Sequence, residues 1–177
     1  MALAWGASIT GVQIPPSRPV LLRELNSGMI HCLLSFIVWT LLMYWMHRFA
    51  HVIPGLKHLH FAHHRYISSN PPPQWHWSNL FIFQDNWTST AEVLVFEFVP
   101  TAIFCWFTGD WWILIFYYCW SAFIQEHIEH NPKFNIYPWL TSGQWHLLHH
   151  ARGTGNYGLF TPVWDLLFGT YKKIPRV

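Results

Sequence analysis

Ten of the 13 histidines in this chain lie in four short clusters. The clusters read HRFAH, HFAHH, HIEH and HLLHH, and they begin at His47, His60, His127 and His146. A helix repeats every 3.6 residues, so side chains three or four positions apart lie on one face, and each cluster presents two or three imidazoles in one direction. Neutral imidazole binds zinc, copper, nickel and iron, and a closed zinc site takes only four ligands. The pattern therefore predicts a site for more than one metal ion.

The histidines outside the clusters are His31, His58 and His76. They lack this spacing, and we interpret them as ordinary hydrogen-bonded residues. The three cysteines form no CxxC pair and lie in apolar stretches, which is typical of packing residues. A net charge of +2, without a basic run interleaved with aromatic residues, argues against nucleic acid as a partner.

The composition is that of a membrane protein. Charged residues make up 10% of the chain, against about 25% in typical soluble domains, while 52% of residues are hydrophobic and 19% aromatic. The uncharged stretch 29–46 is about as long as the roughly 20 residues that a helix needs to cross a bilayer. A second apolar region, 91–125, is interrupted at 108–110 by Thr-Gly-Asp, which predicts a helical hairpin. Its arms are short for full spans, so two thin crossings and a re-entrant hairpin both remain open.

This arrangement brings all four clusters to one side of the membrane. One crossing leads to the first two clusters, and an out-and-back hairpin returns the chain to the same side for the last two. Eight of the ten Lys and Arg residues then share the histidine side, and only Arg18 and Arg23 lie opposite. The positive-inside rule makes the histidine side cytoplasmic. We expect an all-α integral membrane protein with a cytoplasmic helical cap that carries a histidine-rich di-metal site. Residues 1–28 would be a non-cytoplasmic N-terminal segment and 29–177 a single membrane-embedded domain. The cluster groups on either side of the hairpin are both needed to close the site.

The order of these motifs resembles a known family. HxxxH, HxxHH, a histidine pair and a second HxxHH are followed by NYGLFTPVWDLLFGTY, residues 156–171. From about Met29 to Tyr171 the chain is similar to the fatty acid hydroxylase and sterol desaturase superfamily of integral-membrane di-iron enzymes. The resemblance implies two iron ions, with O2 as co-substrate, that remove hydrogen from an unactivated carbon of a lipid delivered from the bilayer. Zinc could replace iron in purified protein. Whether the product is hydroxylated or desaturated stays open.

The resemblance also implies the metal ligands. Matched box to box, they are His47, His51, His60, His63, His64, His127, His130, His146, His149 and His150. His130 stands three rather than four positions after His127, so His130, the following Asn131 or a water could fill the tenth position. Glu126 and Glu129 are candidates for orienting imidazoles, with simple solvation at a helix end as the alternative.

In the tail pattern, Asn156, Tyr157 and Asp165 would pack the C-terminal segment over the site. Because the chain has no room for a fused cytochrome domain, the resemblance implies a separate electron donor, such as a small cytochrome, ferredoxin or reductase. Lys172, Lys173 and Arg176 could dock an acidic carrier, or form a solvated basic tail.

Many members of the superfamily have two membrane hairpins, whereas this chain has one clear helix before the first box. A second subunit could complete the membrane end of a substrate tunnel, so a homo-oligomer is one expectation. The location would be the endoplasmic reticulum in a eukaryote and the inner membrane in a bacterium. The alternative function is that of a membrane metal-ion transporter or metal-binding protein. A transporter should place ligands at a broken helix within the membrane, but these histidines lie at the ends of apolar segments.

Overall fold

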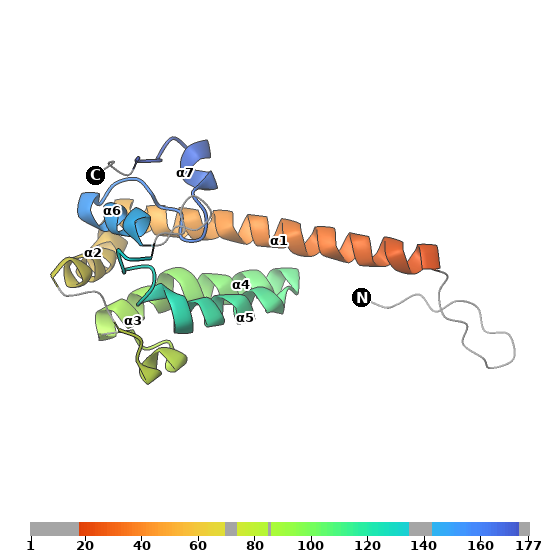
Figure 1. The fold of residues 1–177 in the computed structure, drawn as a ribbon, viewed down its shortest axis with the longest axis horizontal. Coiled ribbons are helices and arrows are strands. Elements are labelled where there is room, and N and C mark those ends of the chain that lie inside the picture. The colour runs from red at the N-terminus through yellow and green to blue at the C-terminus, as the bar shows by residue number, and fades with distance from the viewer. Residues whose placement is uncertain (1–17, 70–73, 85, 135–142, 174–177) are drawn as a thin grey trace, which may run out of the picture. The chain divides into compact units, whose positions relative to one another are not determined.

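The computed structural model describes residues 18–69, 74–84, 86–134 and 143–173. Every element within these ranges is helical, as the sequence predicts (Figure 1). The chain divides into two compact units, residues 1–36 and 37–177. The first helix, α1 (Arg18–Val52), runs across that boundary, and all later elements belong to the second unit.

The α1 helix contains the expected membrane segment but continues beyond it. Its stretch Ser27–Val52 is long and apolar enough to cross a membrane. The sequence HRFAHV contains no glycine or proline, so the helix continues through it. The helix ends at the bend before Pro54, because a proline disfavours helical geometry in the residue that precedes it. His47 and His51 therefore lie in the last two turns of α1 itself, beyond the uncharged stretch 29–46.

The helix α2 (Pro54–Ser69) starts with proline, a favoured first residue, and carries the HFAHH cluster. A 3-10 turn, Trp77–Phe81, follows later in the chain.

The predicted hairpin is present. Its first arm is one continuous rod made of α3 (Trp87–Val93), a π-helical turn (Leu94–Phe98) and α4 (Val99–Thr108). Gly109 ends this rod in the left-handed conformation, at φ 79°, which is the break that the sequence predicts. The second arm consists of α5 (Trp111–Trp120) and another π-helical turn (Ser121–Gln125). Besides the α1 segment, Trp87–Thr108 is the only stretch of the described residues that forms a helix long and apolar enough to span a membrane.

Aromatic packing fixes α1 to the hairpin and to the C-terminal part of the chain. Trp39 of α1 is fully buried, and its Nε1–H donates a 3.0 Å hydrogen bond to Thr101 Oγ1 of α4. Its ring also lies 4.6 Å from the ring of Phe160 and meets Phe116 of α5 edge-on at 5.9 Å. One side chain thus holds together three segments that are distant in sequence, which sets where the last turns of α1 lie.

The C-terminal part contains α6 (Gln144–Arg152), a loop and the short helix α7 (Val163–Leu167). Asp165 of α7 is fully buried and accepts hydrogen bonds from the backbone N–H of Tyr157 and of Gly158, both at 2.8 Å. A side chain at position 158 would place its Cβ 2.2 Å from the carbonyl oxygen of Thr161, so only glycine fits there. Asp165 therefore folds the loop back on itself, which agrees with the structural role expected for the tail motif.

Candidate metal centre

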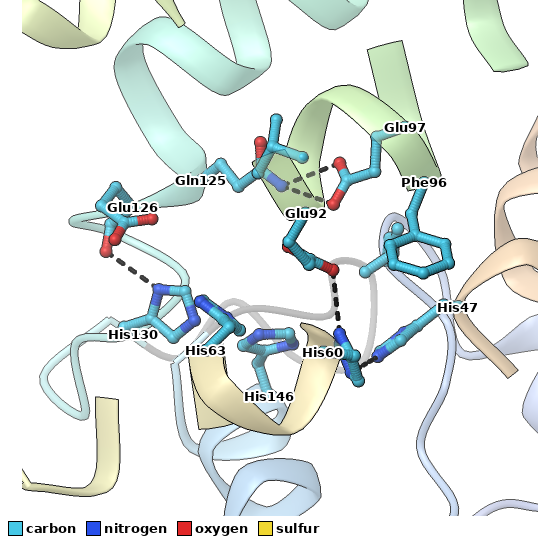
Figure 2. Close-up of a pocket in the computed structure, with 12 residues that line it drawn as sticks. His47, His60, His63, Glu92, Phe96, Glu97, Gln125, Glu126, His130 and His146 are labelled. Carbon is cyan, nitrogen blue, oxygen red and sulfur yellow. Dashed lines mark hydrogen bonds and ion pairs between the residues drawn. The ribbon is translucent and has the colours of Figure 1, made fainter. Parts of the chain in front are cut away.

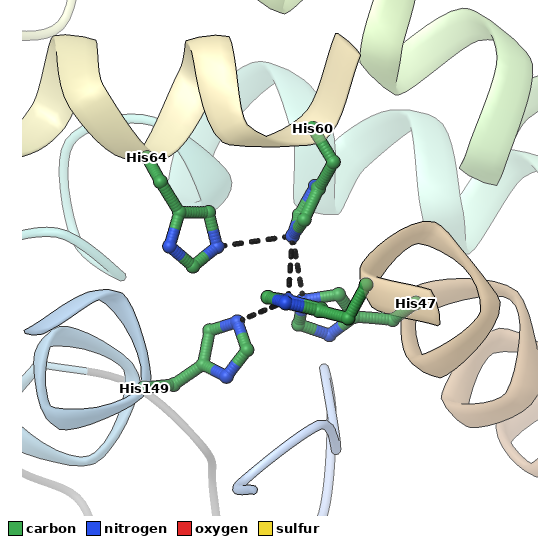
Figure 3. A group of neighbouring side chains, drawn as sticks. His47, His60, His64 and His149 are labelled. Carbon is green, nitrogen blue, oxygen red and sulfur yellow. Dashed lines mark hydrogen bonds between the residues drawn. The ribbon is translucent and has the colours of Figure 1, made fainter. Parts of the chain in front are cut away.

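Nine buried histidines form two groups in which the potential ligand nitrogens lie within 4.8 Å of one another. The five-histidine group consists of His47, His51, His60, His64 and His149 (Figure 3). The four-histidine group consists of His63, His130, His146 and His150. Each group combines residues from before and after the hairpin, as the arrangement of clusters predicts.

Each HxxHH box contributes two histidines to one group and one histidine to the other. On α2, His60 and His64 are four residues apart and face the five-histidine group, whereas His63 faces the other. On α6, His146 and His150 face the four-histidine group, whereas His149 faces the five-histidine group. Adjacent residues on a helix point about 100° apart. The doublet at the end of each box therefore divides its two imidazoles between the two groups.

Backbone carbonyls determine which ring nitrogen is protonated in two members of the five-histidine group. His47 Nδ1 lies 2.7 Å from the carbonyl oxygen of Tyr157, and His149 Nδ1 lies 2.8 Å from that of Gly155. A carbonyl oxygen only accepts hydrogen bonds, so each Nδ1 carries the proton and each Nε2 is left with a bare lone pair. His60 donates from Nδ1 to the carboxylate of Glu92 at 2.8 Å, with the same consequence for its Nε2.

These lone pairs converge on a common point. The Nε2 atom of His60 lies 3.2 Å from that of His47, 2.9 Å from that of His51 and 3.0 Å from that of His64. The Nε2 atom of His51 also lies 3.0 Å from that of His149. Between His47 and His60 no proton is available for a hydrogen bond, so the two lone pairs would repel without a cation. Two nitrogens bound to one ion at about 2.1 Å and at right angles lie about 3.0 Å apart, so the geometry fits a metal ion.

The four-histidine group has the same construction. His130 donates from Nδ1 to the carbonyl oxygen of Glu126 at 3.0 Å, which leaves its Nε2 unprotonated. That Nε2 lies 3.2 Å from His150 Nε2, which in turn lies 3.0 Å from His146 Nε2. The ring of His63 completes the group, with its centroid 5.2 Å from that of His130.

Nine of the ten histidines matched to the superfamily thus come together, and His127 does not. His127 is partly exposed and belongs to neither group, whereas His130, three residues later, is buried in the four-histidine group. A π-helical turn, Ser121–Gln125, precedes both residues and carries one extra residue per turn, which shifts the direction of the side chains that follow. No spacing rule reveals that shift.

Burial keeps these imidazoles neutral, the form that binds metal. Desolvation lowers the pKa of His60 and of His64 to about 3. It lowers the pKa of His130 to about 4, and it holds the pKa values of His146 and His149 well below 6.5, with neighbouring imidazoles adding to the effect.

One buried carboxylate that orients a ligand was not predicted from the sequence. Glu92 lies in the first apolar arm of the hairpin, and it is the hydrogen-bond acceptor of His60 Nδ1. An ionisable residue inside an apolar segment is itself a signal of function. Of the two carboxylates singled out instead, Glu126 contacts His130 through its backbone carbonyl, and burial raises the pKa of the fully buried Glu129.

Both groups open on one small cavity of about 20 Å³ (Figure 2). One wall is histidine and includes His47 and His60 from one group and His63 from the other. The opposite wall is the hairpin, where Gln125 Nε2 donates to both carboxylate oxygens of Glu97, at 2.7 and 2.8 Å. The two π-helical turns carry these two residues, so both irregularities of the hairpin lie at the cavity. The volume holds about one water-sized molecule.

The donor set is made of imidazoles alone, which suits zinc, copper, nickel and iron. Five nitrogens in one group and four in the other can hold one ion each, with the shared cavity beside both. The structure thus shows a candidate centre for two metal ions that a single small molecule could contact together.

The sequence matches a known protein family and several curated proteins. The family model described as fatty acid hydroxylase matches residues 32–170. The Delta(7)-sterol 5(6)-desaturase of Leptosphaeria maculans is 30% identical over 145 residues, which cover 78% of this chain and 36% of the relative. The corresponding enzyme erg3A of Aspergillus fumigatus is 30% identical over 142 residues, with coverage of 78% and 36%. Lathosterol oxidase of Rattus norvegicus is 27% identical over 153 residues, with coverage of 84% and 48%.

The chain therefore spans about a third to a half of the length of these curated relatives. No solved structure matches it at a significant level. The family match covers most of the chain, from the apolar part of α1 to the end of the tail motif, and includes all nine grouped histidines. The chain belongs to the fatty acid hydroxylase family.

Proposed function

We propose that this protein is a di-iron oxidoreductase that uses O2 to desaturate or hydroxylate a membrane lipid. The observation that carries the proposal is the pair of buried histidine groups that share one small cavity. The family match supports iron as the metal in both groups. Two irons held there would supply the activation of O2 and the removal of hydrogen from an unactivated carbon.

The protein's own groups would orient the ligands and keep the site dry. Glu92 and the carbonyl oxygens of Tyr157 and Gly155 fix three imidazoles of the five-histidine group with Nε2 directed inward. The hairpin closes the cavity on the other side, where Phe96 lies beside Glu92 (Figure 2). A 20 Å³ cavity has room for about one molecule of the size of water or O2, so the lipid would lie outside it.

The names of the relatives favour a particular reaction. The desaturases of Leptosphaeria maculans and Aspergillus fumigatus are named for a Delta(7)-sterol and its 5(6) position. We propose a Delta(7)-sterol as the first substrate to test and desaturation as the expected outcome. The balanced reaction removes two hydrogens from the sterol and consumes O2, two electrons and two protons, with two waters formed.

The proposed setting is a membrane. Two described helices are long and apolar enough to cross one, and the relatives favour the endoplasmic reticulum if the source is eukaryotic. The excess of Lys and Arg near the histidine clusters supports a cytoplasmic metal centre. The alternative of a metal-ion transporter is not favoured, because the family match covers 32–170 and the sterol desaturases align over most of the chain.

The test is sterol turnover by membranes that contain the full chain. Membranes from a host that lacks its own sterol desaturase would receive a Delta(7)-sterol, NADPH and an electron-donor system, and products would be measured by gas chromatography and mass spectrometry. We expect O2-dependent loss of two hydrogens with the wild type and none with His63→Ala or His149→Ala. His58→Ala is the matched control, because His58 is an exposed histidine on α2 outside both groups. Full turnover by His149→Ala, or unchanged sterols and unchanged membrane lipids with iron-loaded wild type, would contradict the proposal.

A further inference from the structure

We propose that an exposed groove between α2 and α6 is the docking site for an acidic protein that delivers single electrons. This inference rests on the proposed function, because it names the partner that the same metal centre requires. The groove has a volume of about 290 Å³ and is lined by residues of both helices and by Gly153 at the end of α6.

The floor of the groove belongs to the metal centre. His64 and His150 both line it, and they come from different histidine groups. Their rings are stacked, with centroids 4.1 Å apart and planes inclined by 19°. Among the described residues, neither of these two histidines lines the 20 Å³ cavity against the hairpin. The centre therefore has two separate approaches, one at the hairpin for the substrate and one at this groove.

The rim of the groove is cationic. Arg65 of α2 and Arg152 of α6 both line it, and both are exposed. Lys57 is a third exposed cation close by, because its Nζ lies 5.2 Å from the ring centroid of Phe61, another lining residue.

No carboxylate on the described surface offsets these cations. The acidic residues whose side chains the structure describes are all at least nine-tenths buried: Glu92, Glu97, Asp110, Glu126, Glu129 and Asp165. The described surface thus exposes cationic side chains without anionic ones, and its electrostatic complement is an acidic partner.

The arginines lie beside two stacked histidine rings of the metal centre, which favours a redox protein over an anionic lipid headgroup as the molecule that binds here. A headgroup would need the two cations but would gain nothing from the stacked imidazoles below them. A carrier docked here would instead bring its redox group to one ligand ring of each histidine group. Each docking event would oxidise the carrier by one electron. Two such events, with two protons and O2, balance the desaturation of one substrate.

The C-terminal lysines are not part of the groove. Lys172 and Lys173 are exposed but do not line the groove. The two pairs of cations allow a matched comparison, because substitution of either pair by glutamine removes the same charge.

The experiment uses the iron-loaded full chain in nanodiscs of neutral phosphatidylcholine, with the soluble haem domain of cytochrome b5 as the acidic carrier. Binding is measured by fluorescence anisotropy of the labelled carrier, and electron transfer by stopped-flow reoxidation of its haem. We expect Arg65→Gln/Arg152→Gln to raise the Kd and lower the reoxidation rate by about 10-fold or more at low salt. Lys172→Gln/Lys173→Gln should change either quantity by less than about 2-fold, since peripheral surface charges contribute little. Iron content, and reduction by dithionite, should be the same in all three proteins.

Equal carrier binding by wild type and Arg65→Gln/Arg152→Gln would overturn the docking site, as would a failure of the wild type to bind the carrier. A loss of binding only in the lysine variant would assign docking to the tail and also overturn it. If the arginine variant loses only a dependence on anionic lipid added to the nanodiscs, the arginines bind headgroups instead. Failure of the proposed function looks different: the carrier then binds the groove in a charge-dependent way, but no lipid is oxidised.

Discussion

Glu92 Oε1 accepts a 2.8 Å hydrogen bond from His60 Nδ1, and both side chains are buried. The contact joins α3, at the start of the hairpin, to α2, so it connects the hairpin to the five-histidine group. His60 Nε2 lies within 3.2 Å of three other Nε2 atoms, which makes His60 the most central imidazole of that group. The orientation of one carboxylate in an apolar helix thus sets the position of the central ligand.

Replacing this carboxylate should weaken metal binding. We expect Glu92→Ala to lower iron affinity by about 10- to 100-fold, the usual effect of losing the partner that orients a ligand. Glu92→Gln should lose less, because its amide oxygen can still accept from His60. Competition with a chromophoric chelator measures the affinity. Glu97→Gln is the control, because Glu97 is equally buried on the same rod but contacts Gln125. An equal loss in Glu97→Gln and Glu92→Ala would show that the orienting contact is not responsible.

Asp165 should contribute strongly to the stability of the C-terminal segment. Asp165→Ala leaves the backbone N–H groups of Tyr157 and Gly158 without their charged acceptor. We expect a loss of about 3 kcal/mol of unfolding free energy, since an unsatisfied buried donor costs about 1–3 kcal/mol. Urea unfolding of the protein in detergent, followed by tryptophan fluorescence, measures it. Thr170→Val removes the side-chain hydrogen bonds of Thr170 with Asp165 and with Tyr44, so it should cost about 1–2 kcal/mol and leave the two backbone N–H groups paired. A variant Asp165→Ala as stable as the wild type would contradict this account of the tail.

The HIEH cluster offers a test between neighbouring histidines. We expect His130→Ala to lose the metal of the four-histidine group, because His130 Nε2 lies 3.2 Å from His150 Nε2. His127→Ala should keep both metals, because His127 belongs to neither group. Metal content by plasma mass spectrometry, normalised to protein by amino-acid analysis, separates the two variants. The reverse result would mean that the HIEH segment presents His127 to the metal.

The metal-free protein should become less stable in mild acid. Burial lowers the pKa of His60 and His64 to about 3 in the folded state, from 6.5 when exposed. Below pH 6.5 the unfolded chain therefore binds more protons than the folded one, so the unfolding free energy falls as the pH is lowered towards 3. The stability that these groups contribute is fully present above pH 6.5. Thermal unfolding of chelator-treated protein between pH 7.5 and 4.5 should show a decreasing midpoint. The slope should be shallower in His60→Gln/His64→Gln, and an equal slope in both proteins would argue against buried neutral imidazoles.

The sequence predicts much of this fold because its signals are local. The apolar stretch 29–46, the Thr-Gly-Asp break at 108–110 and the histidine spacings each specify an element or a face without knowledge of the rest. The apolar first helix, the hairpin and the convergence of the clusters follow from them. The end of α1 was placed too early, because hydrophobicity stops at Met46 whereas helical geometry continues to Val52.

The details that were missed depend on tertiary packing. The π-helical turn Ser121–Gln125 determines that His130 rather than His127 joins the four-histidine group. The pairing of Glu92 with His60 depends on how the hairpin packs against α2, which spacing along the chain does not encode. Helix geometry separates the two histidines at the end of each HxxHH box, but the positions of the two groups depend on how α2 and α6 pack against each other, which motif matching does not give.

The most direct test of the two-metal account is the iron stoichiometry of the purified protein, measured with Mössbauer spectra of ⁵⁷Fe-loaded samples. We expect two irons per chain in the wild type. His149→Ala should lose the iron of the five-histidine group and His150→Ala that of the four-histidine group, so that each variant keeps one iron and the two remaining spectral components differ. A wild type that saturates at one iron, or two variants that lose the same component, would contradict the assignment of two separate histidine sites.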